Sequence, residues 1–218
     1  MKAFIFDLNG TMVNDMPYHA KAWTRLLNEE LHAGFSEDQI KANIYGKNPE
    51  VLARLFGEGK FSHDEAEKYS NDKEEQYRLE YKGHMELLPG LKEFLEDAYQ
   101  AGIPMAIGSA AITANIDFVL DNLNIRHYFK AIVSADDVTH SKPDPETFIK
   151  PAKMMGVAPE DCVVFEDVPK GAEAAKNAGM RACILTTTHD PEDFEDRENI
   201  LGFAADFNDL KIKQLIQT

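Results

Sequence analysis

Four short segments of this 218-residue sequence place carboxylate, amide, hydroxyl or amine side chains directly after apolar runs or at turns. They are "FDLNGT" (6–11), "GSA" (108–110), "SKPDP" (141–145) and "FEDVPKG" (165–171). Together they supply three carboxylates, a lysine and a hydroxyl: Asp7, Glu166, Asp167, Lys142 and Ser109. Three acids held together would repel one another and raise a pKa unless a cation joined them. Oxygen ligands favour Mg²⁺, and a lysine and a serine beside a metal and an aspartate suit phosphoryl transfer.

These segments can meet only if the runs before them are neighbouring strands of one sheet. From Leu88 onward, strand-like runs alternate with helical ones, and "KAFIFD" adds a strand at the N-terminus. The later strands are expected at 104–109, 131–136, 162–167 and 181–186. A helix is expected from Asp144 as N-cap, through Pro145, to Gly156. This alternation predicts an α/β fold with a Rossmann-like parallel sheet covered by helices on both faces, which brings the strand ends together.

The stretch from residue 16 to residue 87 has a different pattern. It carries helical periods and no convincing strand, which predicts a helical insertion. We therefore expect a core domain of residues 1–15 and 88–218, and a helical cap domain of residues 16–87. The two connections are close in the predicted fold, and Gly83 and the Pro89–Gly90 pair suit hinges, so the cap could swing as a lid.

The four motifs, in this order, resemble those of the haloacid dehalogenase superfamily. The helical insertion and "MPYHAKAW" (16–23) are similar to its β-phosphoglucomutase-like branch, and the similarity covers nearly the whole chain. The resemblance implies a phosphatase or phosphomutase that acts on small phosphorylated metabolites, with hexose phosphates as the expected substrates. It also implies that Asp7 is the nucleophile and forms an aspartyl-phosphate.

The same resemblance assigns further roles. Mg²⁺ would be held by Asp7, by the main-chain carbonyl of Asn9 and by Asp167, with Glu166 as a ligand directly or through water. Ser109 and nearby main-chain N–H groups would hold the transferring phosphoryl group, and Lys142 would neutralise Asp7. Five residues are expected to bind substrate: His19, Lys47, Lys73, Ala110 and Asn115.

Asn9 departs from the pattern of this family, which normally has an aspartate two residues after the nucleophile as general acid and base. The amide keeps the carbonyl but does not titrate, and losing such a group typically costs about 10²- to 10⁴-fold in rate. Three explanations remain open. The first is that the amide is an engineered substitution. The second is that it is natural and the chemistry tolerates it, through a good leaving group (acyl phosphate or pyrophosphate) or a proton from His19. The third is that the chain is a metal-dependent phosphate-binding protein with little catalysis.

Each motif also has an ordinary structural explanation. "SKPDP" alone is a turn before a helix, and Glu166 and Asp167 could simply cap one. His19 could only pack beside Trp23, and Lys73 could be one of many solvated charges. As a set, the residues at the strand ends are hard to attribute to chance.

Composition limits the other functions. The formal net charge of -15 argues against a nucleic-acid partner or an anionic membrane surface. The two cysteines lie in apolar stretches and are expected to be reduced, which fits a cytoplasmic protein without a signal peptide. No GxGxxG motif follows the first strand, so a dinucleotide enzyme is disfavoured, and the Glu166–Asp167 pair argues against a metal-free dehalogenase. We expect a monomer.

Overall fold

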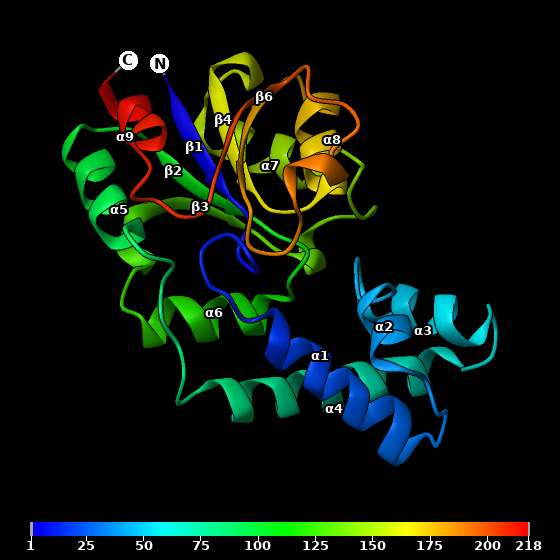
Figure 1. The fold of residues 1–218 in the computed structure, drawn as a ribbon. Coiled ribbons are helices and arrows are strands. Elements are labelled where there is room, and N and C mark those ends of the chain that lie inside the picture. Colours follow the sequence, from blue (N-terminus) through cyan, green and yellow to red (C-terminus); the bar gives the residue numbers. More distant parts are fainter. Residues whose placement is uncertain (1, 218) are drawn as a thin grey trace. The chain divides into compact units, whose positions relative to one another are not determined.

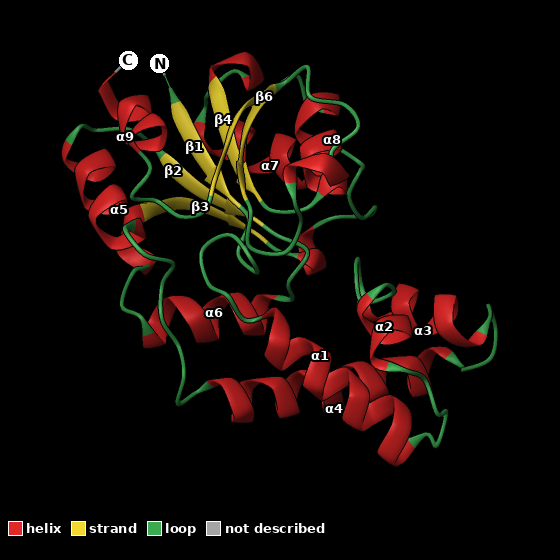
Figure 2. Cartoon of the chain, viewed as in Figure 1, coloured by secondary structure: helices red, strands yellow, loops and turns green. Residues whose placement is uncertain are grey.

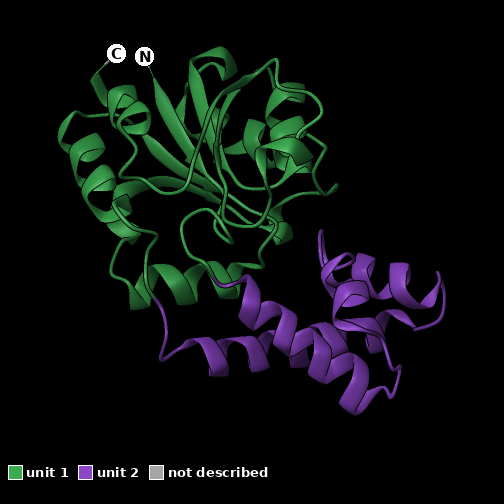
Figure 3. Ribbon diagram, viewed as in Figure 1, with its two compact units in different colours: residues 1–14, 86–218 green, residues 15–85 purple. Residues whose placement is uncertain are grey.

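The computed structural model describes residues 2–217. The chain divides into two compact units, one of residues 1–14 and 86–218 and the other of residues 15–85 (Figure 3). Among the described residues, every strand belongs to the first unit, and the second is built of helices and turns (Figure 2). None of the described helices combines the length and apolar character needed to span a membrane.

The first unit is built on one six-stranded sheet. Its strands are β1 (Ala3–Phe6), β2 (Met105–Gly108), β3 (Phe129–Val133), β4 (Cys162–Glu166), β5 (Arg181–Leu185) and β6 (Ile200–Ala204). They pair in parallel in the order β3-β2-β1-β4-β5-β6 (Figure 1). The parallel sheet predicted from the sequence is confirmed. The order of the strands reverses on either side of β1, and open sheets bind ligands at the carboxyl ends next to such a point.

The edges of this sheet differ from the prediction. The edge strand β6 was not predicted, because its run "ILGFA" is short, half-buried and interrupted by Gly202. At the other edge, β3 was expected at 131–136 but ends at Val133. It ends there because the hydroxyl of Ser134 accepts the N–H of Asp136 and begins a 3₁₀ turn over Ala135–Asp137.

The alternation of side chains along β1 places different residues on the two faces of the sheet. Phe4 and Phe6 lie on one face; the ring of Phe6 stacks on Phe165, with centroids 4.8 Å apart, and Phe94 of α5 (Leu91–Gln100) packs against Phe4. On the other face Ile5 joins a buried cluster with residues of α7 (Glu146–Met155) and α8 (Pro169–Asn177). Burial on both faces explains why the strands read as continuous apolar runs.

The helices of this unit follow the predicted pattern with one shift. The helix α7 begins at Glu146, one residue later than expected, since Pro145 is its N-cap; the carboxylate of Asp144 accepts the N–H of Glu146 at 2.9 Å. It ends before Gly156, as predicted. Two further helices are α6 (Thr113–Asn122) and α9 (Leu210–Gln217), and short 3₁₀ turns occupy Arg126–Tyr128, Pro159–Asp161 and Pro191–Asp193.

The second unit has its own apolar core. Its helices are α1 (Met16–Thr24), a π-helical continuation (Arg25–Glu30), α2 (Glu37–Lys41), α3 (Asn48–Phe56) and α4 (His63–Tyr81). The buried core consists of Trp23, Leu26, Leu27, Ile40, Val51 and Leu52. The helices α2 and α4 each begin with a capping box, Ser36 with Gln39 and Ser62 with Glu65, which satisfies main-chain N–H groups at their first turns.

Candidate active site at the strand ends

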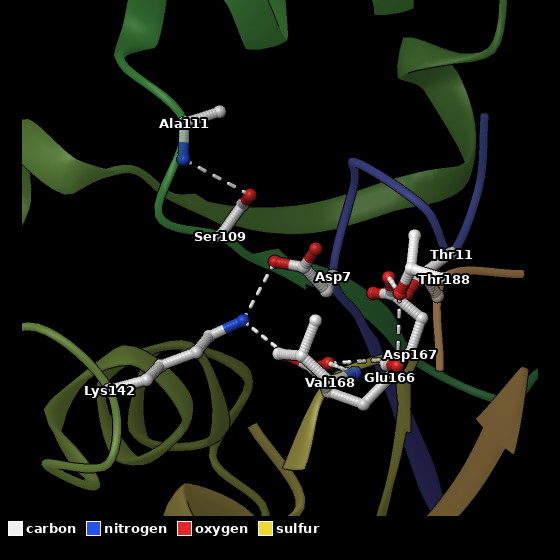
Figure 4. Close-up of polar contacts among 9 residues, drawn as sticks. All are labelled: Asp7, Thr11, Ser109, Ala111, Lys142, Glu166, Asp167, Val168 and Thr188. Atoms are coloured by element: carbon white, nitrogen blue, oxygen red, sulfur yellow. Dashed lines mark hydrogen bonds and ion pairs between the residues drawn. The ribbon is translucent and has the colours of Figure 1, made fainter. Parts of the chain in front are cut away.

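Asp7 stands at the carboxyl end of β1, in the middle of the sheet. Its main-chain N–H donates to the carbonyl of Phe165 at 3.0 Å, so the residue is still held by the sheet. The last pair of β1 and β4 is Phe6 with Phe165, and one step further Asp7 comes level with Glu166. The Lys142 ammonium donates to Asp7 Oδ1 at 2.8 Å and to Glu166 Oε1 at 2.5 Å (Figure 4). The predicted meeting of these three motifs is therefore seen in the structure.

Ser109 lies at the end of the neighbouring strand β2. Its N–H donates to the carbonyl of Val133, and its hydroxyl accepts the N–H of Ala111 at 3.2 Å. The side chain is buried, and its hydrogen bond to Asp7 helps to lower the pKa of that carboxyl. The turn at Ala110 thus presents a hydroxyl and main-chain groups next to Asp7, a suitable arrangement for binding an oxyanion.

Glu166 is held by protein donors at both of its carboxylate oxygens. Oε1 accepts from Lys142, and Oε2 accepts the N–H groups of Asp167 at 2.7 Å and Val168 at 2.9 Å. The side chain folds against the first turn of α8, where a Cβ on Gly171 would lie 1.9 Å from Oε1. Whether Glu166 also binds a metal ion, directly or through water, stays a prediction; in this structure its carboxylate orients Lys142.

Asp167 is held in a different way, by one hydroxyl on each carboxylate oxygen. Thr11 donates to Oδ1 at 3.0 Å, and Thr188 donates to Oδ2 at 2.5 Å. Gly10, with φ of +73°, comes so close that an added Cβ would lie 2.1 Å from Oδ2. Sequence reasoning missed Thr188, which lies 21 residues after Asp167 and carries no motif; only the fold brings it to this carboxylate.

The loop after β1 places Asn9 two residues beyond the central carboxylate. Three successive N–H groups, from Thr11 to Val13, point to the carbonyl of Leu8 at 2.9 to 3.4 Å, and the Gly10 N–H donates to the carbonyl of Val13. Asn9 itself forms an isolated bridge with Val13, and its side chain is half-buried. Main-chain hydrogen bonds hold this turn, so an amide in place of a carboxylate at position 9 leaves it intact.

The buried charges of this site are not balanced by protein groups. Burial raises the pKa of Asp7; Lys142 lowers it and Glu166 raises it, and the net value is about 6. The pKa of Asp167 is raised well above its usual range by burial and by the neighbouring Glu166 and Asp7. Burial alone would lower the pKa of Lys142, but Asp7 and Glu166 raise it overall.

The donor chemistry fits a divalent metal ion. The three carboxylates and Lys142 carry a formal charge of about -2, which a divalent cation would offset. Among residues 2–217, no group of three or more His, Cys, Asp and Glu side chains is arranged to hold a metal ion. A set made of Asp7, Asp167 and the main-chain carbonyl of Asn9 contains two carboxylates and needs no third acid. All three ligands are hard oxygen donors, as Mg²⁺ prefers.

In the helical unit, Lys73 is the centre of a buried polar cluster. Its ammonium lies 2.8 Å from His19 Nδ1 and 2.8 Å from Glu74 Oε1, which also accepts from Asn48 at 2.7 Å. Lys73 is only 3% exposed, so it is not a solvated surface charge. Burial lowers the pKa of Lys73 more than Glu74 raises it. For Glu74, burial raises the pKa, but the attraction of Lys73 and His19 and the hydrogen bonds from Lys73 and Asn48 outweigh it and bring the pKa to about 2.

His19 is oriented from several sides within the same unit. Its ring stacks on Tyr77 with centroids 3.8 Å apart, and Tyr77 donates its hydroxyl proton to Asp15 at 2.5 Å. The Lys73 ammonium lies 5.2 Å from the ring centre of Trp23. An ammonium group only donates, so His19 Nδ1 accepts from Lys73 and the ring proton is on Nε2.

The three remaining predicted residues are Lys47, Ala110 and Asn115. Lys47 is the half-buried N-cap of α3, and its N–H donates to Glu50 at 3.1 Å. Asn115 is buried in the first turn of α6, and Ala110 is half-buried in the turn after β2. The structure places each of them without showing what it binds.

Comparison with known proteins gives one consistent family. A family model described as haloacid dehalogenase-like hydrolase matches residues 1–179. The fructose-1-phosphate phosphatase YqaB of Escherichia coli K12 is 36% identical over 179 residues, which cover 82% of this chain and 93% of that protein. The β-phosphoglucomutase of Bacillus subtilis 168 is 32% identical over 189 residues, with 84% and 82% covered. A β-phosphoglucomutase structure from Clostridium difficile superposes with a TM-score of 0.83 at 25% identity, covering 100% of this chain and 96% of that one.

Proposed function

The chain belongs to the haloacid dehalogenase-like hydrolases, and from this membership we propose that it is a Mg²⁺-dependent phosphotransferase of small sugar phosphates that works through Asp7. It is an enzyme of the phosphohydrolase or phosphomutase kind, since relatives above 30% identity are a fructose-1-phosphate phosphatase and a β-phosphoglucomutase. Phosphate release is the activity that we assign first, because a sugar phosphatase is the more similar of these two relatives.

The observation that carries this proposal is the orientation of the Asp7 carboxylate. It is 6% exposed, at the end of the central strand, with one oxygen fixed by Lys142 at 2.8 Å. A pKa of about 6 leaves the group ionised at neutral pH and therefore nucleophilic. Lys142 is in turn fixed by Glu166, so the nucleophile is held in place before a substrate arrives.

In the first step, a carboxylate oxygen of Asp7 attacks the phosphorus of the substrate. The bond from phosphorus to the sugar oxygen breaks, its electron pair leaves with the sugar, and that oxygen takes up a proton from solvent. Ser109 and the main-chain N–H groups after it hold the phosphoryl oxygens, and Lys142 neutralises their charge. In the second step, a water oxygen attacks the phosphorus, the bond from phosphorus to Asp7 breaks and frees the carboxylate, and the proton of the water passes to the released phosphate.

Asp7, Asp167 and the carbonyl of Asn9 would hold Mg²⁺, which when bound supplies positive charge for the phosphoryl oxygens. The charge of about -2 in this region supports this assignment. We propose that Glu166 reaches the metal through water and not directly, because its oxygens already accept from Lys142 and from two main-chain N–H groups.

Asn9 favours a second candidate activity. An amide cannot give a proton to a departing sugar alkoxide, so turnover of sugar phosphates should be slow. An acyl phosphate or a pyrophosphate needs no such proton, and the chain would hydrolyse these substrates with less loss. If no other group supplies the proton, the protein acts mainly as a metal-dependent phosphate-binding protein with little catalysis.

We assign the choice of substrate to the helical unit, acting as a cap. His19, Lys47 and Lys73 are the candidates for substrate contact. Lys73 is buried and already donates to two partners, so we propose that it orients His19. Lys47, which is half-buried at the start of α3, is the candidate for direct contact with an anionic sugar phosphate.

The test is a steady-state phosphatase assay of the wild type and Asn9→Asp with Mg²⁺. We expect Asn9→Asp to raise kcat on hexose phosphates at least about tenfold, which corresponds to about 1.4 kcal/mol, and to change acetyl phosphate hydrolysis much less. Asp7→Asn and EDTA should each abolish turnover. Adding glucose 1,6-bisphosphate separates a mutase from a phosphatase. The mechanism is wrong if Asp7→Asn stays active, and the role given to Asn9 is wrong if Asn9→Asp is no faster.

A further inference from the structure

The segment after β5, residues 186–189, reaches back to the two loops that carry the proposed metal ligands. The hydroxyl of Thr188 donates to Asp167 Oδ2 at 2.5 Å, and the hydroxyl of Thr187 hydrogen-bonds to the carbonyl of Gly10. Adjacent residues therefore hold the carboxylate of Asp167 and the peptide next to Asn9. Both threonines lie beyond residue 179, where the match with the family model ends, so that match assigns them no role.

The two hydroxyls on Asp167 fix the plane of its carboxylate. Thr11 donates to one oxygen at 3.0 Å and Thr188 to the other, while Gly10 closes on the same oxygen as Thr188. An ionised carboxylate has about four acceptor positions, so two donors leave room on each oxygen for a cation. Partners of this kind orient metal ligands, and losing one typically costs about 10- to 100-fold in metal affinity.

The hydroxyl proton of Thr188 can serve one acceptor at a time. The same oxygen lies 2.9 Å from His189 Nδ1. If Thr188 gives its proton to Asp167, then Thr188 Oγ1 accepts a proton from His189 Nδ1–H. Of the two Asp167 acceptors near Thr188 Oγ1, the carboxylate oxygen at 2.5 Å is closer than the main-chain carbonyl at 3.2 Å, so the proton goes to the carboxylate.

We propose that Thr188 is a positioning residue for a divalent cation, because it holds the Asp167 carboxylate in the orientation in which that carboxylate binds the metal. His189 orients the threonine hydroxyl, and Thr187 hydrogen-bonds to the carbonyl of Gly10. This inference rests on the proposed function, since it assumes that Asp167 is a ligand.

The experiment measures Mg²⁺ binding itself by isothermal titration calorimetry, with MgCl₂ titrated into the full chain. Thr188→Val keeps the shape of the side chain and removes the hydroxyl, and we expect it to weaken the Kd at least about tenfold. Thr188→Ser, which restores the hydroxyl, should return to within about threefold of the wild type. Thr139→Val is the matched control, because Thr139 is exposed and contacts α7 through its main chain.

Activity gives a second readout. The Mg²⁺ concentration for half-maximal activity of Thr188→Val should rise by the same factor, while kcat at saturating Mg²⁺ stays near the wild-type value. Unfolding in EDTA checks that the variant is folded, and Thr188→Ala replaces it in the titration if it is not.

The outcomes separate the two proposals. If the wild type binds Mg²⁺ and Thr188→Val binds it within about twofold, the positioning role is wrong and the proposed function stands. If the wild type binds no Mg²⁺, both the metal-dependent function and this inference are overturned.

Discussion

Helix propensity and the packing of Gly171 predict opposite effects of the substitution Gly171→Ala on the stability of the fold. In an ordinary helix, replacing glycine by alanine stabilises the fold by up to about 1 kcal/mol, because alanine loses less backbone entropy. Gly171 is the third residue of α8, so the sequence alone favours this outcome. The structure predicts the reverse, because an added Cβ would lie 1.9 Å from Glu166 Oε1 and 2.5 Å from Oε2. Glu166 would have to leave its position.

The cost follows from the bonds that Glu166 would lose. Its carboxylate accepts from two main-chain N–H groups at 2.7 and 2.9 Å and from Lys142 at 2.5 Å. Hydrogen bonds to a charged group contribute roughly 1.5 to 3 kcal/mol each. Losing two of them, less the gain from helix propensity, destabilises the fold by about 2 to 5 kcal/mol.

Urea unfolding of the wild type and of Gly171→Ala measures this difference, and a phosphatase assay measures the second effect. Because Glu166 orients Lys142, the variant should also lose at least about tenfold in kcat. Gly202→Ala in β6 is the control, since nothing lies within 4 Å of its added Cβ, and it should neither destabilise the fold nor lower kcat. If Gly171→Ala is as stable as the wild type or more stable, Glu166 does not hold the position described for it.

Two further predictions concern the buried cluster of the helical unit. Lys73→Met leaves Glu74 buried without its cation and should cost about 3 to 5 kcal/mol in urea unfolding. Lys68→Met on the same helix breaks the exposed pair with Asp72 and the contact with the Tyr69 ring, and it should cost less than about 1 kcal/mol. Equal effects would contradict the burial of Lys73. The pKa of Glu74 is lowered to about 2 by folding, so its contribution of about 3 kcal/mol is present above its unfolded pKa near 4.5 and is lost as pH falls toward 2. Glu74→Gln should flatten the pH dependence of the unfolding free energy in that window, and an unchanged slope would refute the assignment.

Much of the fold could be read from the order of the apolar runs. Five of the six strands and the helices between them follow from segments such as "AFIF" and "CVVFE", because a strand buried on both faces must be apolar throughout. The edge strand β6 was not predicted, because an edge strand is partly exposed to solvent and its residues need not be continuously apolar. The strand β3 ends earlier than predicted because Ser134 caps a turn, a local hydrogen bond that an apolar pattern does not show.

The candidate site was predictable where a residue type alone limits its chemistry. A carboxylate at the end of the central strand, followed by a glycine turn, is a specific arrangement, and Asp7 and Asp167 are brought together as the parallel sheet requires. Lys73 was harder to interpret, because "NDKEEQY" is as polar as any solvated helix and only packing shows that this lysine is buried.

The sequence by itself determined which groups stand at the carboxyl ends of the strands, since each of them directly follows an apolar run. It also determined that position 9 carries an amide that cannot transfer a proton. Only the tertiary structure decided the partner of each group: Glu166 turns to Lys142 and two N–H groups, and Asp167 to the hydroxyls of Thr11 and Thr188. The physical reason is that these contacts join segments up to 156 residues apart, and their geometry depends on how closely the loops pack.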